Sequence, residues 1–573
     1  MRTIAGRLTR VVTRALDVRL SGRSALACGA AVGLVIAWLT LDPGFVWGTS
    51  RYWELPLDDA AQHLAGLTAF ARDRWHFPIL EIAGFGQPEG ANAANLDVIP
   101  LLAVPVKLLY PLSGRVFLYF GLWVALCRVL QGALSAALLF ELGERRAASL
   151  LAVSLLAGGL PSLLERALHE ALSSQFLLLL AFLLYLRIVR ATSIRAVTLA
   201  SSLLLVVSLL VHPYLLAMVF PLCAAGFAER RRRRRLSGWA ALGIPVAQAA
   251  GLLLLMLVCG HFAAWRPRFA DAGWTMNLLS PFLSSESTLL PATRWLPDAA
   301  SVLAPEGTNY LGLGVLLLLA LTALSAGSAL LGPVRRHPWL GGVLVALALF
   351  SLSARVSFAH TVVLSYRLPG LLALPFTVFQ GTGRFFWPAS LALVVWPVAV
   401  LARRFPAAAG ATLLAFACTV QWLDLAAVRA RALHDTRRHQ TDPLGAGREA
   451  WVALVARHRS IEAFPSNACA EPGQFDEEFD LQLQLLAVRA GVPINSAYLA
   501  RPNKDCRREA EQERRALREP VPEGTLRVFY AYPGRPTPAA ADDPRSCRPF
   551  SRGFVCTRAW RDAASGYWSA LPR

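Results

Sequence analysis

The stretch VIPLLAVPVKLLYPL, at residues 98–112, decides how this chain is threaded. It is apolar, but it is shorter than the roughly 20 residues that a helix needs to cross the hydrocarbon core of a bilayer. It also contains Pro100, Pro105 and Pro111, and prolines at this density disfavour a regular helix. Whether residues 98–112 cross the membrane determines the side on which every later segment lies.

About eleven other runs are long and apolar enough to span a membrane. They cover residues 24–42, 116–140, 146–161, 171–189, 196–212, 214–228, 237–260, 309–332, 338–358, 388–402 and 406–426. The sequence therefore predicts a mainly α-helical, polytopic membrane bundle.

Clusters of basic residues between these runs fix the predicted topology. They lie at residues 2–23, 145–146, 187–195, 230–235, 335–336 and 403–404. Short basic loops stay in the cytoplasm, and all of these clusters share one side only if residues 98–112 do not span. We therefore expect 98–112 to be a re-entrant or surface helix on the outer side. The outer side then receives residues 43–115, 162–170, 212–213, 261–308, 359–387 and everything after 427.

The composition agrees with this class. The chain has 573 residues, 55% hydrophobic and 16% charged, with a mean hydropathy of +0.46. Soluble proteins are about 45–50% apolar and 25% charged, and disorder requires low hydrophobicity, so both classes are excluded. The net charge of +20 would suit a nucleic-acid binder. The Arg230–Arg235 run is better explained as a topology anchor, so no nucleic-acid partner is expected.

The predicted domains follow from this topology. Residues 1–23 form a basic cytoplasmic N-terminus before an uncleaved anchor, residues 24–426 form the membrane domain, and residues 427–573 form an outer domain. All but two of the 57 basic residues are arginine, a bias that fits a GC-rich bacterial genome. The expected location is therefore the bacterial inner membrane, with the C-terminal domain in the periplasm.

The C-terminal domain carries four cysteines, Cys469, Cys506, Cys547 and Cys556. Four cysteines in an oxidising compartment predict two disulfides, and three pairings are open. A zinc site is less favoured because no C-x-x-C pair is present. Glycine and proline separate short apolar runs such as Leu481–Val488, so we expect a small α/β domain.

The first outer segment is the richest candidate for chemistry. Asp58 and Asp59 precede apolar positions at helical spacing, so either can cap a helix. Asp59 and His63 then share a face, and Asp58 and Gln62 share the adjacent one. One interpretation is a capping acid before an interfacial amphipathic helix. The other is a carboxylate that acts as a general base or holds a divalent cation.

Further polar residues lie in the other predicted outer segments. Asp97 flanks the same loop as Asp59 and could meet it in space. Arg166 and His169 are three residues apart and would share a helix face. His212 interrupts an apolar run and is either a structural hydrogen-bonding residue or a ligand. Arg384 either extends to the membrane surface or binds a phosphate through a bidentate fork.

The chain resembles the GT-C superfamily of membrane glycosyltransferases, which use polyprenyl-phosphate-linked sugar donors. More closely, it resembles a bacterial family of GT-C-like proteins of undefined substrate. The resemblance rests on the stretches at residues 59–63, 97–102, 306–312, 383–387 and 495–501. It implies an inverting transferase with a GT-C-like fold, acting on a glycan, lipid or protein acceptor among membrane lipids.

The resemblance also implies roles for individual residues. Asp59 would be the catalytic base, with Asp58 as its neighbour, and Asp97 would be a second acid. Arg384 and Arg367 would bind the donor phosphate. The cavity would be lined by Gln62, His63, Arg166, His169, His212, Glu306, Asn309 and Tyr310. Asp59 and Asp97 would hold a divalent cation such as Mg²⁺ or Mn²⁺, although the adjacent Asp58-Asp59 pair departs from the family's Asp-x-Asp pattern and leaves metal dependence open.

Three alternatives remain at this point. A flippase or transporter for lipid-linked sugars would carry ionisable residues inside its spans. A polysaccharide polymerase would also use arginines in its outer loops. A non-catalytic envelope assembly protein would use its outer domain to bind a partner.

Overall fold

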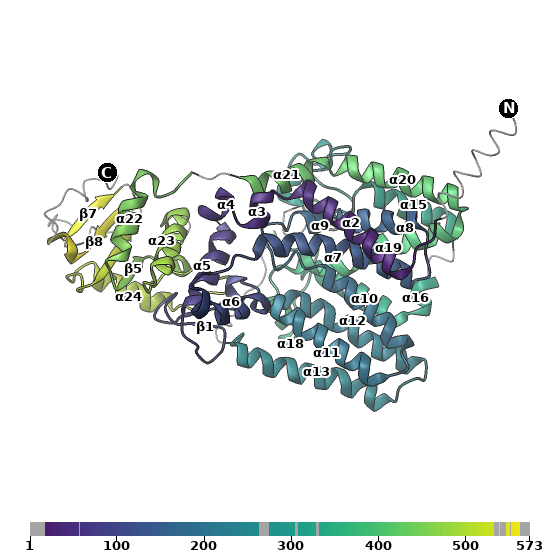
Figure 1. The fold of residues 1–573 in the computed structure, drawn as a ribbon, viewed down its shortest axis with the longest axis horizontal. Coiled ribbons are helices and arrows are strands. Elements are labelled where there is room, and N and C mark those ends of the chain that lie inside the picture. The colour runs from purple at the N-terminus through teal and green to yellow at the C-terminus, as the bar shows by residue number, and fades with distance from the viewer. Residues whose placement is uncertain are drawn as a thin grey trace. The chain divides into compact units, whose positions relative to one another are not determined.

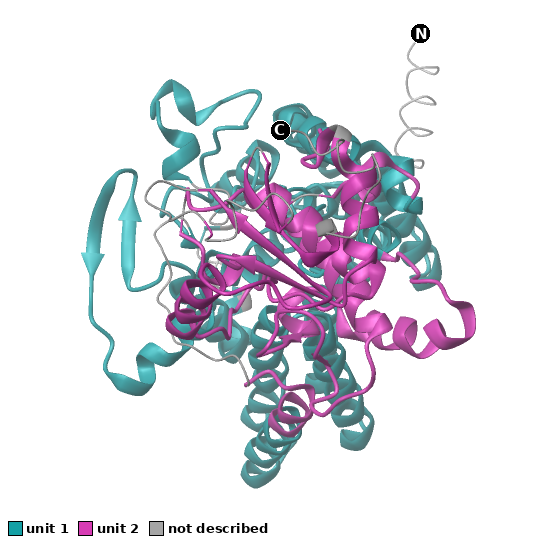
Figure 2. Ribbon diagram, turned by 90° about the vertical axis from the view of Figure 1, so that its left-hand side faces the viewer, with its two compact units in different colours: residues 1–48, 120–252, 267–437 teal, residues 49–119, 253–266, 438–573 magenta. Residues whose placement is uncertain are grey.

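A computed structural model describes residues 18–56, 58–262, 274–303, 308–327, 332–438, 441–471, 473–531, 538, 546–550 and 552–561. The chain divides into two compact units, coloured teal and magenta in Figure 2. Unit 1 comprises Met1–Gly48, Phe120–Leu252 and Pro267–Arg437, and unit 2 comprises Thr49–Tyr119, Leu253–Arg266 and Arg438–Arg573.

Unit 1 is a bundle of helices (Figure 1). Its helices are α2 (Gly22–Thr40), α3 (Pro43–Trp47), α7 (Phe120–Glu141), α8 (Ala147–Gly158), α9 (Pro161–Leu164), α10 (Phe176–Arg190), α11 (Ile194–Val211), α12 (Pro213–Arg232), most of α13 (Gly238–Cys259), α14 (Ala299–Val302), α15 (Leu313–Ala326), α16 (Gly332–Arg336), α17 (Pro338–Ser351), α18 (Gly370–Val378), α19 (Trp387–Arg404), α20 (Ala407–Asp424) and α21 (Ala426–Arg437). A hairpin of β3 (Arg355–Phe358) and β4 (Thr361–Ser365) interrupts the helices.

Each of the eleven apolar runs contains a helix, which confirms the mainly helical fold. Six helices of the described residues are long and apolar enough to cross a membrane: Gly22–Thr40, Phe120–Glu141, Ile194–Val211, Gly238–Cys259, Thr382–Arg404 and Ala407–Asp424. Four more apolar helices of the described residues are shorter: Pro100–Ser113, Ala147–Gly158, Leu313–Ser325 and Pro338–Ser351. These helices indicate a membrane protein, while the full count of eleven spans stays a prediction.

Small residues allow α2 and α7 to pack closely. A Cβ atom added to Gly29 would fall on the carbonyl oxygen of Gly132, and one added to Gly33 would fall on that of Arg128. Ser154 of α8 donates a hydrogen bond to the carbonyl of Gly132 at 2.9 Å. In apolar surroundings, where helix association depends on close van der Waals contact, such small residues set the distance between helices.

Residues 98–112 form a helix despite their prolines. Helix α6 (Pro100–Ser113) belongs to unit 2 and continues through Pro105 and Pro111, so the expectation that these prolines disfavour a regular helix is wrong. Its 14 residues extend roughly 21 Å, which is less than the roughly 30 Å of a hydrocarbon core. Lys107 is buried in α6: its Nζ donates to the carbonyl of Arg74 at 3.0 Å and lies 4.2 Å from the centre of the Phe70 ring.

Unit 2 combines the first loop with the C-terminal tail. The loop contributes α4 (Arg51–Glu54), α5 (Asp58–Arg72), β1 (Glu81–Ile82), β2 (Ala91–Asn92), the 3-10 helix η1 (Ala93–Leu96) and α6. The tail contributes α22 (Arg448–Ala456), β5 (Ser460–Phe464), α23 (Glu477–Ala490), α24 (Cys506–Ala516), β6 (Thr525–Tyr530), β7 (Cys547–Phe550) and β8 (Gly553–Cys556). The tail strands form one sheet in the order β5-β6-β8-β7, with β5 parallel to β6 and the other pairs antiparallel. This arrangement confirms the predicted α/β domain.

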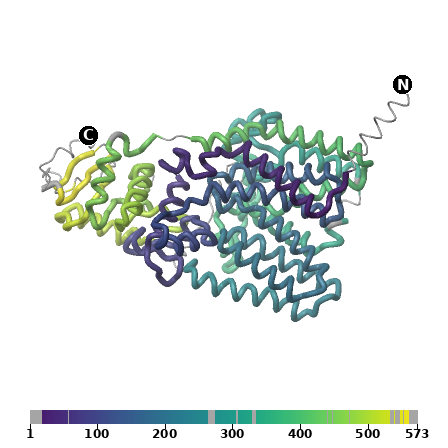
Figure 3. Tube along the Cα trace, viewed as in Figure 1, coloured from purple at the N-terminus to yellow at the C-terminus, as the bar shows by residue number. Residues whose placement is uncertain are grey.

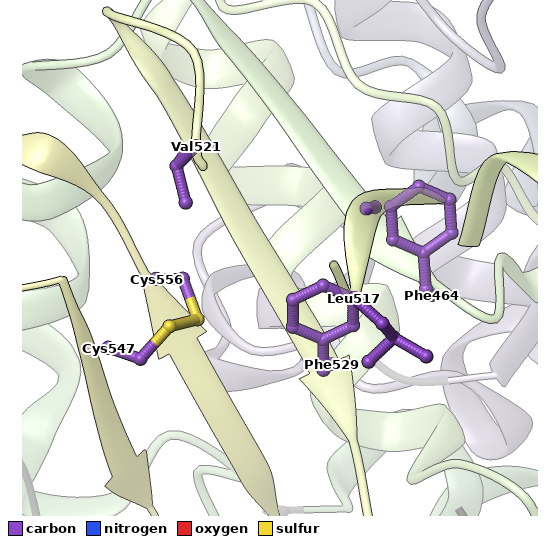
Figure 4. Packing of buried hydrophobic residues seen from close by; sticks show 7 residues of the cluster. Phe464, Leu517, Val521, Phe529, Cys547 and Cys556 are labelled. Carbon is purple, nitrogen blue, oxygen red and sulfur yellow. A yellow bond between two sulfur atoms is a disulfide. The ribbon is translucent and has the colours of Figure 1, made fainter. Parts of the chain in front are cut away.

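Two disulfides fasten the tail, as predicted, and their pairing is now defined. Cys469 is bonded to Cys506 at the start of α24. Cys547 and Cys556 join β7 to β8, and Figure 4 shows this bond beside the buried side chains of Phe464, Leu517, Val521 and Phe529.

The first loop and the tail are joined through their backbones. Gly86 N and Gln87 N both donate to the carbonyl of Ile494, at 2.9 and 3.0 Å, and Phe85 forms a parallel bridge with Ile494. Lys504 Nζ donates to the carbonyl of Gln87 at 2.9 Å and to that of Asn495. In the Cα trace of Figure 3 the blue loop and the green-to-yellow tail lie side by side.

The structure therefore groups the chain differently from the predicted domains. Residues 43–115 were expected within the membrane domain, whereas Thr49–Tyr119 belong to the same unit as the tail. The physical reason is that β1 and β2 are two residues each, so the loop completes its hydrogen bonding on the tail.

The glycine contact between α2 and α7 can be tested with a matched pair of variants. We expect Gly33→Ala to destabilise the protein by about 1–3 kcal/mol, because the new methyl group overpacks the helix contact. Gly251→Ala on α13 is the control: nothing lies within 4 Å of its new methyl group, and alanine favours helix over glycine. Thermal unfolding in detergent measures both, and equal melting temperatures for the two variants would contradict the packing argument.

Candidate functional site

Helix α5 presents its two acidic residues at its first turn. Asp58 is exposed and Asp59 is partly exposed, whereas Ala60 through Ala71 are buried on every side. The helix begins at the predicted place. It is an interior helix of unit 2, so the interpretation as an interfacial amphipathic helix, with one apolar face and one solvent-exposed face, is wrong. Its neighbours α23 and α6 cover the faces that the sequence pattern left open.

Helices α5 and α23 run side by side in the same direction. Gln482 Nε2 donates to the carbonyl of Pro56 at 2.6 Å at their N-terminal ends. The guanidinium of Arg72 donates to the carbonyl of Arg489 at their C-terminal ends. The partial positive charges of both N-termini therefore lie together, and they favour carboxylates there.

Carboxylates from both helices meet at this point. The pKa of Glu477 is raised by its partial burial and then by the negative charges of Asp58, Asp59 and Glu478. Four acids that interact in this way form an acidic surface at the joined helix ends.

Tyr498 connects this acidic surface to the tail. Its hydroxyl donates to Asp59 Oδ1 at 3.3 Å, and Gln62 Nε2 donates to its carbonyl at 2.9 Å. Burial, followed by the charges of Asp59 and Glu477, raises the pKa of Tyr498, so its hydroxyl stays protonated and remains a donor. Gln62 and Asp59, both predicted site residues, thus hold the same tyrosine.

A buried carboxylate lies behind Tyr498. Asp480 accepts hydrogen bonds from Tyr530 Oη at 2.8 Å, Ser496 Oγ at 2.9 Å and Gln484 Nε2 at 2.6 Å. Gln484 Oε1 in turn accepts the backbone N–H of Tyr498 at 3.1 Å. Burial raises the pKa of Asp480 to about 6, although these donors lower it. The sequence contained a signal for this residue, since Asp480 interrupts the apolar positions of α23.

The second predicted acid lies elsewhere in unit 2. Asp97 has a positive φ of 49° at the end of η1. A Cβ added to Gly66 would contact Leu96 and Val98, so the residues on either side of Asp97 pack against the middle of α5. Gly66 is roughly 10 Å along the helix axis from Asp59, at 1.5 Å per residue. The described residues contain no group of three or more His, Cys, Asp or Glu side chains that could hold a metal ion.

In unit 1, Arg384 is buried on an aromatic side chain. It lies in the 3-10 helix η6 (Thr382–Phe386), with its guanidinium carbon 4.8 Å from the centre of the Tyr214 ring. Tyr214 Oη accepts the backbone N–H of Gly381 at 2.8 Å, and Asn309 Nδ2 donates to the carbonyl of Gly383 at 2.9 Å. The loop that carries Arg384 is therefore held on both sides, and Arg384 does not extend to the surface.

Other predicted cavity residues of unit 1 have structural partners. His212 caps α12, and its Nδ1 accepts the N–H of Tyr214 at 3.1 Å. Of the two roles expected for this histidine, the structure shows the structural hydrogen bond. Tyr310 donates to Asp424 Oδ2 at 2.8 Å.

The remaining predicted residues lie apart from these contacts. Arg367 is exposed after β4. Glu306 lies outside the described residues. His63, in unit 2, is buried within α5.

Arg166 and His169 do not share a helix face, so that prediction is wrong. Helix α9 ends at Leu164, and residues 165–168 form turns. The carbonyl of Arg166 accepts the N–H of His169 at 3.2 Å and the hydroxyl of Ser173 at 2.5 Å. These local bonds occupy the carbonyl oxygen of Arg166, which in a continuing helix would accept the N–H of the residue four positions later.

Comparisons with known proteins place the chain in a family. A family model described as "Domain of unknown function (DUF6311)" matches residues 30–426, and one described as "DUF6311 C-terminal domain" matches residues 450–558. The chain belongs to the DUF6311 family. No curated protein matches it. The first match ends at residue 426 and the second begins at residue 450, so the boundary between them lies close to residue 427, the predicted start of the tail.

One charged residue of this DUF6311 protein was missed by the sequence interpretation. Arg128 is fully buried near the middle of α7. Its Nη2 donates to the carbonyl of Leu164 at 3.2 Å, while its Nε and Nη1 find no hydrogen-bond partner among the described residues. A single arginine inside an apolar run of 22 residues is the signal that could have found it.

Asp480 makes the stability of the DUF6311 tail depend on pH. Its pKa rises from an ordinary 3.8 to about 6 on folding, so the folded state binds a proton more tightly than the unfolded state. This contribution to stability is present below about pH 4 and is lost as the pH rises to about 6.

We therefore expect Asp480→Asn to lower the free energy of unfolding more at about pH 4.5 than at about pH 7.5, and the two losses should differ by about 2 kcal/mol. Thermal unfolding at the two pH values measures this difference. The exposed Glu511→Gln is the control and should behave like wild type at both pH values. An Asp480→Asn deficit that does not change with pH would contradict the argument.

Proposed function

We propose that this protein is a membrane glycosyltransferase that moves a sugar from a polyprenyl-phosphate-linked donor to a hydroxyl acceptor. The observation that carries the proposal is the position of Asp59. This partly exposed carboxylate lies at the end of a buried helix, oriented by the hydroxyl of Tyr498 and surrounded by the tail. A base for a hydroxyl acceptor requires such a fixed carboxylate at a surface that substrate can reach.

The shared unit of loop and tail supports the proposed topology. Because Thr49–Tyr119 and Arg438–Arg573 fold together, both must lie on the same side of the membrane. The end of α13 joins them, since the carbonyl of Cys259 accepts the side-chain amide of Asn92 at 2.8 Å. The eleven-span topology satisfies both conditions. Two disulfides fit an oxidising compartment, so we place unit 2 in the periplasm of a bacterium.

Arg384 is the residue that we assign to the donor phosphate. A guanidinium pairs with phosphate through a planar fork. A hydrogen-bonding group that is held in place before the reaction stabilises the developing charge without having to reorganise. The stack on Tyr214 and the bond from Asn309 to Gly383 supply that rigidity. Arg367 is exposed, so we do not assign it to the donor.

The proposed transfer couples one proton transfer to the exchange of one bond at the anomeric carbon. Asp59 takes the proton of the acceptor hydroxyl, and the acceptor oxygen forms a bond to the anomeric carbon. The bond from that carbon to the phosphate oxygen breaks on the opposite face, which inverts the configuration. Polyprenyl phosphate departs with the electron pair, and Arg384 stabilises its charge. No step of the proposed transfer uses a cation, and the expectation that Asp59 and Asp97 hold one stays a prediction.

Arg128 favours transport of a lipid-linked sugar as the second candidate. A buried arginine inside a spanning helix is expensive and usually marks a functional path. In a transporter the essential residue would be Arg128, whereas in a transferase it would be Asp59, and this difference separates the two functions.

The catalytic role of Asp59 predicts that Asp59→Asn lowers transfer by about 10²–10⁴-fold, because an amide cannot accept the proton. Glu54→Gln is the matched control, since Glu54 is an exposed carboxylate on the neighbouring helix α4. Mass spectrometry of lipids and glycans from a complemented deletion strain measures the product. Normal product with Asp59→Asn, together with its loss in Arg128→Leu, would replace the transferase with the transporter.

The role of Arg384 predicts a graded series. We expect Arg384→Ala to lower the rate by about 10²–10³-fold, and Arg384→Lys to retain part of it because the charge stays while the fork is lost. The exposed Arg367→Gln should transfer at close to the wild-type rate. Expression and membrane insertion are checked for each variant, and equal rates for Arg384→Ala and wild type would remove Arg384 from the mechanism.

A further inference from the structure

An arm of unit 1 exposes apolar residues that no described part of the unit covers. We define the arm as residues 355–378, which comprise β3, β4 and α18. Figure 2 shows the hairpin, at the left of the view, standing away from the helices of its own unit. The hairpin is held near its turn, since Leu278 N donates to the carbonyl of Ser357 at 2.9 Å and Asn277 Nδ2 donates to that of Ala359 at 3.0 Å.

Strand β4 exposes apolar residues on both of its faces. Val362, Val363 and Leu364 are 42%, 54% and 55% exposed, respectively. Successive side chains of a strand point to opposite faces, so Val362 and Leu364 lie on one face of β4, and Val363 lies on the other face between Thr361 and Ser365. In α18, Leu371 is 86% exposed and Leu372 is 62% exposed. A long apolar edge strand in water is an aggregation site, so this arm requires a covering.

The covering must reach both faces of a narrow hairpin. A folded protein partner presents one surface and covers one face of a strand. Lipid surrounds an inserted segment on all sides, and the energy gained is about 25 cal/mol for each Å² of apolar area removed from water. The exposure on both faces therefore favours lipid over a protein partner.

The arm is also held near a bilayer by its connections. Helix α17 ends at Ser351, three residues before the arm begins, and the candidate span Thr382–Arg404 starts shortly after α18 ends at Val378. Three linking residues extend roughly 10 Å. An arm tied at both ends to apolar helices cannot move far from the membrane surface.

The charges of the arm fit an anionic surface. Arg355 stands at the base of β3, His360 lies in the turn and Arg367 follows β4. The sequence contains no acidic residue between Glu306 and Asp424. Basic residues that flank an apolar segment attract acidic headgroups, at about 1 kcal/mol for each cation.

We propose that the arm inserts its apolar residues into the lipid interface and that Arg355 and Arg367 bind the phosphates of anionic lipid headgroups. This function is independent of sugar transfer, because it uses none of the residues assigned to the reaction. It gives Arg367 a partner of the chemistry that the sequence predicted, a phosphate, in a lipid headgroup.

A polarity-sensitive label can test the proposal in the full-length protein. Val363→Cys is made with Cys28→Ser, because Cys28 is partly exposed and the other free cysteines are buried. The protein is labelled with a nitrobenzoxadiazole dye and placed in nanodiscs of phosphatidylethanolamine and phosphatidylglycerol. We expect spin-labelled lipid to quench the dye at least several-fold more strongly than iodide does. Glu511→Cys, exposed on α24, is the control and should show the reverse order.

Two results would overturn the proposal. A label at residue 363 that iodide quenches as strongly as the control would place the hairpin in water. A label protected from both quenchers would show that protein, such as a second copy of the chain, covers the arm. For the charges, Arg355→Gln with Arg367→Gln should reduce quenching by lipid several-fold, and unchanged quenching would overturn the headgroup assignment.

Discussion

The hydrogen bonds between Ile494 and the first loop are the interaction on which unit 2 depends. They join a loop that has only two short strands to a tail that has a sheet. Because of this junction α23 can pack along α5, so that residues 60–71 are buried and the acidic first turn of α5 reaches the surface. Without it α5 would have to turn a dozen buried, mostly apolar residues toward water. The candidate base thus owes its position to residues more than four hundred positions away in the sequence.

Both units solve the problem of a buried carboxylate in the same way. Asp480 in unit 2 accepts two hydroxyls and an amide, and Asp424 in unit 1 accepts the hydroxyls of Tyr310 and Ser287 and the N–H of Leu313. A buried acid without such donors would cost several kcal/mol, whereas a fully satisfied one fixes the elements that surround it. In each case the donors come from separate elements, so the carboxylate acts as a rigid junction.

Local patterns predicted most of the fold and only part of the candidate site. Apolar runs located the helices, cysteine placement predicted two disulfides, and Asp58-Asp59 marked the start of α5. The pairing of Phe85 with Ile494 and the network of Asp480 join residues far apart in the chain, and no local pattern encodes them. Arg166 and His169 show a different limit, because the hydroxyl of Ser173 competes for a backbone carbonyl that helical spacing assigns to the helix. Asp59 and Asp97 flank one loop, yet the loop packs Leu96 and Val98, the neighbours of Asp97, against Gly66.

The two lysines have a consequence for how the molecule can be observed. Every other basic side chain of the 57 is an arginine, and both lysines are buried in unit 2. Lys107 donates to the carbonyl of Arg74, and Lys504 donates to the carbonyls of Gln87 and Asn495 and pairs with Glu509 at 3.2 Å. A compact ammonium fits such a cradle, whereas a broad guanidinium does not. An acylating reagent can therefore modify a lysine only when unit 2 opens. Acylation of Lys107 and Lys504 would therefore report the local opening of unit 2 in an intact membrane, without a substitution in the chain.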